Sequence, residues 1–152
     1  MRILRVWCAL LLFAVSALAA DDPFTGTWKL NIAKSKLLVG DKTKSDVYHM
    51  VIDDSTIKFS DEVMLDKEVR NITVDAKFDG KYYPIKGDPD TDTVAYHRNG
   101  NTVTVMLKKG GKVVGKDKVV VSQDGQITTV TFIVYSKEKP QTGTAVYEKQ
   151  PN

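Results

Sequence analysis

Hydrophobic and polar residues alternate along most of the chain after residue 23. The clearest example is the segment 68–78 (EVRNITVDAKF), where Ile72, Val74 and Ala76 share one face and polar residues occupy the other. A period of two places successive side chains on opposite faces of an extended chain, as in a half-buried β-strand. The pattern therefore predicts a strand over this segment.

Turn signals separate further segments of this kind, at intervals of about eight to twelve residues. They include Asp79-Gly80 and Asn99-Gly100, where glycine accepts the positive φ that tight turns require. We predict about nine or ten short strands, because this spacing is typical of antiparallel sandwiches and barrels. The expected ranges are 24–31, 45–53, 55–60 with a continuation over 63–65, 68–78, 81–86, 93–98, 102–108, 112–122, 126–136 and 143–149.

Tight turns between successive strands favour an all-β, antiparallel up-and-down barrel of about eight to ten strands, because closure removes the exposed sheet edges. The segment 32–39 breaks the alternation and predicts one or two helical turns, ended by Gly40. Pro84 cannot donate a ladder hydrogen bond, so we expect it at an edge or an irregularity. Gly115 inside a strand pattern predicts a β-bulge.

The first residues have the pattern of a secretory signal. Arg2 and Arg5 precede an apolar stretch over 6–18, which ends in the small-x-small sequence Ala17-Leu18-Ala19. The apolar stretch is shorter than the roughly 20 residues that a membrane helix requires. We expect cleavage after Ala19, so that 1–19 is a signal peptide and 20–152 is a single domain, secreted or periplasmic, with no stable membrane anchor.

Cysteine usage and charge narrow the function further. Cys8, within the expected signal, is the only cysteine, so 20–152 can form neither disulfides nor thiolate metal sites. The formal net charge of +3 includes Arg2 and Arg5. A chain cleaved after Ala19 would therefore carry about +1, with both signs interspersed, which argues against nucleic acid as a partner. We expect a monomer.

The segment around Gly26 and Trp28 carries a family resemblance. Gly-x-Trp on the first strand, the run GTWKLNIAKSK, and the later runs FDGKYYPIKGDPDTDTV and KKGGKVV resemble a largely uncharacterised group of secreted bacterial lipocalin-like (calycin-type) β-barrel proteins. The resemblance implies that the tryptophan closes one end of the barrel. It also implies that a basic residue of the last strand, here Lys149, packs over Trp28.

An eight-stranded barrel can either fill its interior with side chains or hold one small ligand. Our first hypothesis is a non-catalytic lipocalin-like protein that binds a small apolar or amphipathic molecule inside the barrel. Apolar and aromatic residues with a few polar groups are typical of such pockets. The predicted ligand-binding residues are Trp28, Tyr48, Met50, Phe59, Phe78, Tyr83, Tyr96, Val105, Phe132 and Tyr147.

Two other hypotheses remain open. A filled core would make the protein a structural or interaction module of the cell envelope, with the lysine-rich segment 108–118 as a candidate contact surface. A small hydrolase or isomerase would place His49 or His97 in a cleft beside a carboxylate.

No motif in the sequence predicts a catalytic residue, a metal ion or a cofactor. The two histidines lack partners at metal-ligand spacing, and Gly-x-Ser-x-Gly is absent. The acidic segment 87–92 (GDPDTD) lacks the glycine and glutamate of a calcium loop, so we interpret it as a solvated turn. Acidic pairs such as Asp61-Glu62 are interpreted as ordinary turn and strand residues.

Overall fold

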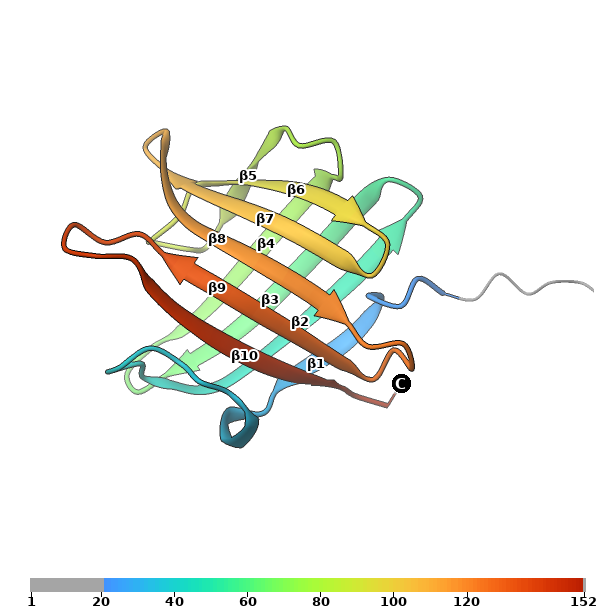
Figure 1. Cartoon of the computed structure of the whole chain (residues 1–152), viewed down its shortest axis with the longest axis horizontal. Helices are drawn as coiled ribbons and strands as arrows, with labels where there is room; N and C mark the ends of the chain where they lie inside the picture. Colours follow the sequence, from blue (N-terminus) through green and yellow to red (C-terminus); the bar gives the residue numbers. More distant parts are fainter. Residues whose placement is uncertain (1–20, 152) are drawn as a thin grey trace, which may run out of the picture.

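The computed structural model describes residues 21–151, which form a closed barrel of ten antiparallel strands and one short 3-10 helix (Figure 1). The expected signal peptide, 1–19, lies outside the described residues. The strands are β1 (Gly26–Leu30), β2 (Thr43–Asp53), β3 (Thr56–Leu65), β4 (Val69–Lys77), β5 (Tyr82–Lys86), β6 (Thr93–Asn99), β7 (Thr102–Lys109), β8 (Lys112–Val121), β9 (Ile127–Val134) and β10 (Gln141–Lys149).

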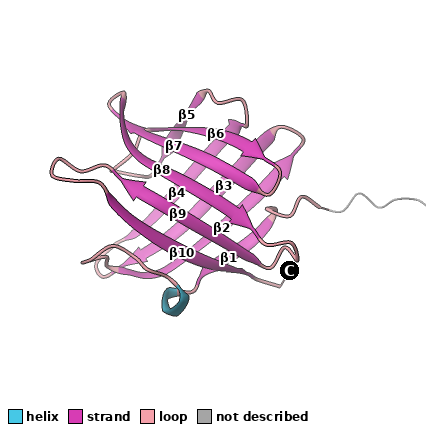
Figure 2. Ribbon diagram, viewed as in Figure 1, coloured by secondary structure: helices cyan, strands magenta, loops and turns pink. Residues whose placement is uncertain are grey.

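Each strand pairs with the next along the chain, and β10 returns to pair with β1 (Figure 2). The closing contact is short and aligns Trp28 with Lys149 and Leu30 with Tyr147. The predicted all-β, antiparallel up-and-down barrel is therefore confirmed. Closure leaves no free sheet edge among the strands.

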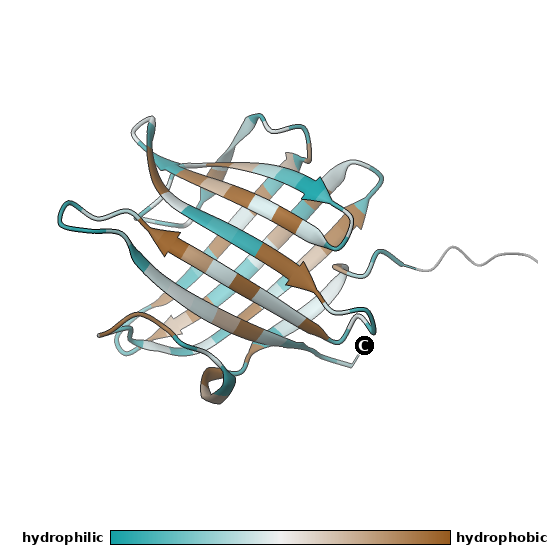
Figure 3. Ribbon diagram, viewed as in Figure 1, coloured by the Kyte–Doolittle hydropathy of each residue, from teal (hydrophilic) through white to brown (hydrophobic). Residues whose placement is uncertain are grey.

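Alternation sorts the side chains between the interior and the surface, and Figure 3 shows it as brown and teal bands along the strands. On β2, for example, Tyr48 and Met50 are buried while His49 and Val51 are exposed. The inward set forms one continuous cluster: Phe24, Trp28, Tyr48, Met50, Ile57, Val74, Ala76, Val94, Tyr96, Val103, Val105 and Val121.

Both predicted irregularities occur. β5 pairs with β6 through Tyr82–Pro84 but with β4 only through Ile85 and Lys86, so the ladder changes partner beside the proline. On β8 the register shifts where Leu107 faces Gly115 and the next residue of β7 faces Val113. That shift is the β-bulge predicted at Gly115.

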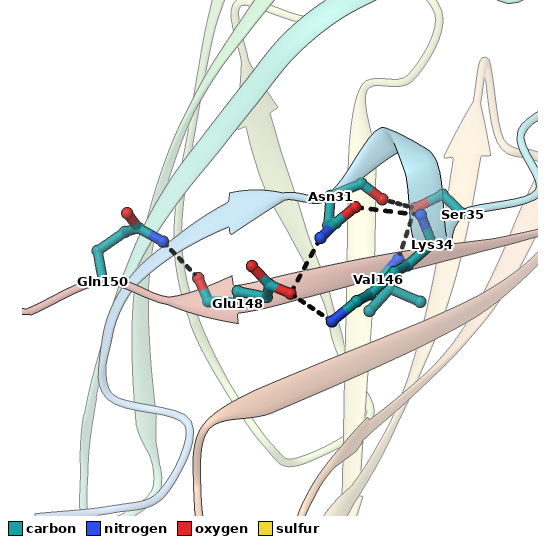
Figure 4. A network of polar contacts seen from close by, with 6 residues as sticks. All are labelled: Asn31, Lys34, Ser35, Val146, Glu148 and Gln150. Atoms are coloured by element: carbon teal, nitrogen blue, oxygen red, sulfur yellow. Dashed lines mark hydrogen bonds and ion pairs between the residues drawn. The ribbon is translucent and has the colours of Figure 1, made fainter.

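The predicted helical segment is shorter than expected. Only η1 (Ile32–Lys34) is helical, and Lys36 already forms a β-bridge with Thr144. Side chains fix the turn to β10 (Figure 4): the Glu148 carboxylate accepts from the Asn31 amide at 3.0 Å and from Lys34 Nζ at 2.8 Å. The residues after Lys34 therefore pair with β10 instead of continuing the helix. No helix within residues 21–151 has the length and hydrophobicity needed to cross a membrane.

Trp28 packs at the β1–β10 junction. Its side chain is fully buried, and its Nε1 donates to the Phe24 carbonyl at 2.9 Å. Lys149 Nζ lies 5.3 Å from the indole ring, so the basic residue that the resemblance implies is in place. Gly26 has a φ of 142°, and a Cβ there would lie 2.6 Å from Lys149 Cε. The glycine of Gly-x-Trp therefore makes room for the lysine.

We expect Gly87→Ala to destabilise the barrel more than Gly80→Ala does. Both glycines have positive φ, which costs an L-residue about 1–2 kcal/mol. A Cβ at Gly87 would also overlap the Asn71 carbonyl of β4, whereas one at Gly80 meets nothing within 4 Å. Urea unfolding followed by circular dichroism should show a loss of at least about 3 kcal/mol for Gly87→Ala. Equal losses in the two variants would contradict this packing.

Candidate ligand-binding site

The barrel encloses a partly open cavity of about 230 Å³. Its wall comes from β2 to β10 and from Phe24, which precedes β1. Most of this wall is aliphatic or aromatic. The lining residues are Phe24, Tyr48, Met50, Ile57, Phe59, Asp61, Ile72, Val74, Ile85, Asp88, Thr91, Val94, Tyr96, Val103, Val105, Leu107, Asp117, Val119, Val130 and Tyr147.

The structure brings together six of the ten residues predicted to contact a ligand. These lie on β2, β3, β6, β7 and β10, and their side chains converge because strand alternation turns each of them inward. Three of their rings are in contact: Tyr48 lies 5.5 Å from Phe59 and 4.9 Å from Tyr147 between centroids. The six are Tyr48, Met50, Phe59, Tyr96, Val105 and Tyr147.

Four predicted residues do not line the cavity. Trp28 stacks behind Tyr48 with centroids 6.1 Å apart, and Phe78 lies against Tyr96 at 6.2 Å. The Tyr83 hydroxyl donates to Asp79 at 2.9 Å, and the Phe132 ring covers Gly143. Sequence periodicity predicts which face of the sheet a residue occupies but not its position along the barrel axis. It therefore predicts these four residues in the cavity wall, although they lie outside it.

Carboxyl groups are the part of the wall that the sequence interpretation missed. Asp61, Asp88 and Asp117 line the cavity. Asp61 is a strand residue, as the sequence indicated, but it occupies an inward position of β3 opposite Tyr48, which the sequence interpretation did not foresee. Strand parity was the available signal for Asp117, since it shares a face of β8 with Val119 and Val121.

Asp46, which does not line the cavity itself, lies beside Asp61 where β2 pairs with β3. Asp46 is two residues from Tyr48 on the same face of β2, which makes it the diagonal neighbour of Asp61. Its Oδ2 accepts a hydrogen bond from the Tyr147 hydroxyl at 2.8 Å. Four oxygens here are buried: Asp46 Oδ1, Asp61 Oδ1, the Tyr48 hydroxyl and the Thr128 hydroxyl. None of them has a hydrogen-bond partner among the described residues outside this group of four.

Burial controls the protonation of this pair. Desolvation raises the pKa of both Asp46 and Asp61, and the charge of Asp46 raises the pKa of Asp61 further. The Tyr147 hydroxyl and a hydrogen bond with Asp61 oppose the shift at Asp46. Two adjacent carboxylates in an apolar wall cannot both ionise readily, so Asp61 holds its proton well above the usual range and can donate to Asp46.

Asp117 stands apart from this pair, on β8 between Val105 and Phe132 of the adjoining strands. Its carboxyl faces the cavity, yet protein atoms surround it on the other sides. Burial alone raises the pKa of Asp117 to about 7. Because no cation compensates the shift, Asp117 exchanges its proton near neutrality.

The tyrosines of the wall remain neutral donors. Desolvation is the main cause that raises the pKa of Tyr48, Tyr96 and Tyr147 above the ordinary tyrosine value, and nearby aspartates add to it. A neutral phenol can both donate and accept a hydrogen bond. The cavity therefore combines apolar surface with a few converging polar groups, which is the composition of a small-molecule site.

Neither histidine belongs to this site. His49 and His97 occupy exposed, outward positions on β2 and β6, and His49 Nδ1 lies 3.0 Å from the Thr27 hydroxyl. Among residues 21–151, no group of three or more histidine, cysteine, aspartate or glutamate side chains is arranged to hold a metal ion. The polar groups of the cavity wall are therefore mainly carboxyls and phenols. The histidine–carboxylate cleft that the hydrolase hypothesis requires is not found at this site.

Comparison with known proteins identifies the fold. No protein-family model and no curated protein matches the sequence. Among solved structures, zebrafish ileal bile acid-binding protein, complexed with cholic acid, superposes with a TM-score of 0.61 at 11% sequence identity. The match covers 85% of this chain and 100% of that one. This chain and that protein therefore share a barrel fold. At this identity the likeness concerns the fold alone, and the bacterial and secreted parts of the resemblance remain predictions.

We expect Asp117→Asn to stabilise the protein at pH 8 and to leave its stability nearly unchanged at pH 4. An unfolded aspartate ionises near pH 4, whereas Asp117 in the barrel ionises at about 7. Between these values the folded state binds more protons than the unfolded state, so stability falls as pH rises. Removing the group should recover up to about 4 kcal/mol at pH 8.

Urea unfolding at both pH values measures this effect. Asp75→Asn on the outer face of β4 is the matched control, because Asp75 is exposed. The same gain in both variants, or an Asp117→Asn gain that is independent of pH, would show that the Asp117 carboxyl is not desolvated.

Proposed function

We propose that this protein is an exported binding protein that holds one small apolar or amphipathic molecule inside its barrel and does not transform it. The observation that carries the proposal is the cavity of about 230 Å³, with its apolar and aromatic wall and few converging polar groups. This volume lies below the roughly 300–1,000 Å³ of typical small-molecule pockets. The expected ligand is therefore small or extends partly beyond the cavity.

The structural neighbour supports the same class of function. It is a bile acid-binding protein in complex with cholic acid, an amphipathic molecule. A shared barrel does not transfer a ligand, because function depends on the side chains of the site. The likeness supports interior binding of an amphipathic molecule, and the chemistry of the ligand must come from this chain's own wall.

The other two hypotheses find less support. A structural module with a filled core would need no cavity, although Tyr82 and the 108–118 lysines remain an available surface, with Lys108 Nζ 3.6 Å from the Tyr82 ring centroid. A hydrolase or isomerase would need His49 or His97 in a cleft, and both are exposed on the outside. Binding without catalysis is the function that the interior supports best.

We expect Val119→Phe to weaken ligand binding at least about tenfold, because the added ring would occupy part of the cavity. Val119 lines the cavity, whereas its neighbour Val120 is exposed on the outer face of β8. Val120→Phe is thus a matched control that should bind like the unmodified protein. Titration calorimetry with 1-octanol, octanoate and octylammonium provides the measurement. Binding of none of the three, or equal binding by both variants, would contradict an interior site.

Export makes a separate prediction. The arginines and apolar stretch of 1–18, followed by Ala19, should direct the chain out of the cytoplasm and be removed. Expression in a bacterium followed by fractionation and N-terminal sequencing should find a chain beginning at Ala20 outside the cytoplasm. Recovery of the intact chain beginning at Met1 in the cytoplasm would contradict this part of the proposal.

A further inference from the structure

The charge of the cavity wall has one sign. Its ionisable side chains, apart from tyrosines, are the three carboxyls of Asp61, Asp88 and Asp117, and no lysine, arginine or histidine lines it. Asp46 adds a fourth carboxyl directly behind Asp61, bonded to the lining residue Tyr147. A ligand in this cavity meets acceptors and acids, with no fixed positive charge to pair with an anion.

Two inward-facing arginines lie near the ends of the barrel, and neither offers a free charge to the cavity. Arg70 of β4 bonds Glu68 and lies 2.8 Å from Asp90 Oδ2. Arg98 of β6 pairs with Asp22 and covers the rings of Phe24 and Phe78, at 5.2 and 5.8 Å from their centroids. Both guanidinium groups are already paired with carboxylates.

Three buried oxygens beside the cavity have no hydrogen-bond partner among the described residues apart from one another and Thr128. They are Asp61 Oδ1, Asp46 Oδ1 and the hydroxyl of Tyr48, a residue only 5% exposed. Strand register places Asp46 and Asp61 side by side as diagonal neighbours, with Tyr48 opposite Asp61. Buried polar atoms without partners are uncommon in folded proteins, and each one requires an explanation.

A protonated amine matches this arrangement. An ammonium group carries three N–H donors and no acceptor, as lysine shows. The carboxylates of Asp61 and Asp46 and the Tyr48 hydroxyl can all accept a hydrogen bond. The surrounding rings of Tyr48, Phe59 and Tyr147 add the negative faces that attract ligand cations. The remainder of the wall is aliphatic and suits an apolar body.

We propose that the cavity binds an amphipathic amine, with its ammonium group held by Asp61, Asp46 and the Tyr48 hydroxyl and its apolar part against the aliphatic wall. The inference rests on the proposed function, because it specifies the class of ligand for the same cavity. It also distinguishes this chain from the zebrafish bile acid-binding protein, which is complexed with cholic acid, a molecule that carries a carboxyl group.

Protonation explains how the empty barrel tolerates such a site. Burial and the neighbouring charge of Asp46 raise the pKa of Asp61, so without a ligand the pair shares a proton. A bound ammonium group replaces that proton and allows both carboxyls to ionise beside a positive charge. A carboxylate ligand would instead add a further negative charge to a wall that carries only acids.

The test compares three eight-carbon probes that differ in their head group. Octylammonium, 1-octanol and octanoate are titrated into the purified protein by calorimetry at pH 7.5 and constant ionic strength. We expect octylammonium to bind at least about tenfold more tightly than octanoate, with octanol between them. Calcium chloride is titrated separately, because an acidic site of oxygens could hold that ion instead.

Asp61→Asn locates the head group. Asparagine has the shape of a protonated aspartate, so the fold should tolerate the change, which circular dichroism and urea unfolding verify. Octylammonium affinity should fall at least about tenfold while octanol affinity stays within about twofold. Asp75→Asn removes the same charge from the exposed face of β4 and should change neither affinity.

The possible outcomes distinguish the amine proposal from the proposed function of interior binding. If octanol or octanoate bound as tightly as octylammonium, and Val119→Phe still weakened binding, the amine proposal would be overturned and interior binding would stand. Equal losses of octylammonium binding in the two asparagine variants would show general charge attraction and also overturn it. Calcium binding that excludes octylammonium would assign the site to a metal. Failure of all three probes to bind would overturn both proposals.

Discussion

Pairing of β1 with β10 closes the barrel, and the cavity exists only because that closure holds. The contact aligns few residues, with Trp28 opposite Lys149 and Leu30 opposite Tyr147. It is reinforced from inside by the buried indole and from outside by Glu148, which binds Asn31 and Lys34 of the turn after β1. Opening this contact would expose the rings of Tyr48 and Tyr147 and leave two free strand edges, a state prone to pairing with other chains.

The same closure determines the environment of the acids. Asp46 and Asp61 belong to the directly paired strands β2 and β3, and Tyr147 of β10 reaches them because β1 bridges β2 and β10. Their burial has a cost, because carboxyls taken out of water lose solvation that apolar side chains cannot replace. A core designed for stability alone would place valine or leucine there. Several acids in an otherwise apolar interior agree with the proposed role in binding better than with a role in stability.

Much of the fold follows from local sequence. Alternation predicts the strands, the loss of a donor at Pro84 coincides with the change of partner on β5, and Gly115 lies at the bulge. The site is less predictable. Periodicity identifies inward positions such as Tyr48 and Tyr96 but treats Trp28 alike, although Trp28 lies behind the wall. The aspartates were missed because an acidic residue is assigned to a turn or the surface by composition, whereas strand parity alone turns Asp117 inward.

A protonated Asp61 explains how the barrel can be stable without a ligand and still contain a selective site. A proton shared between Asp46 and Asp61 supplies one donor to two carboxyls, which leaves other acceptor positions and the Tyr48 hydroxyl unused. An ammonium ligand supplies three donors and the compensating charge, so it satisfies what the proton cannot. Selectivity among ligands then depends on these oxygens. A neutral apolar molecule leaves them without hydrogen-bond donors, and an anion is repelled by the carboxylates. In this proposal the barrel determines that a small molecule is enclosed, and the carboxyls of its wall determine the sign of charge that the ligand carries.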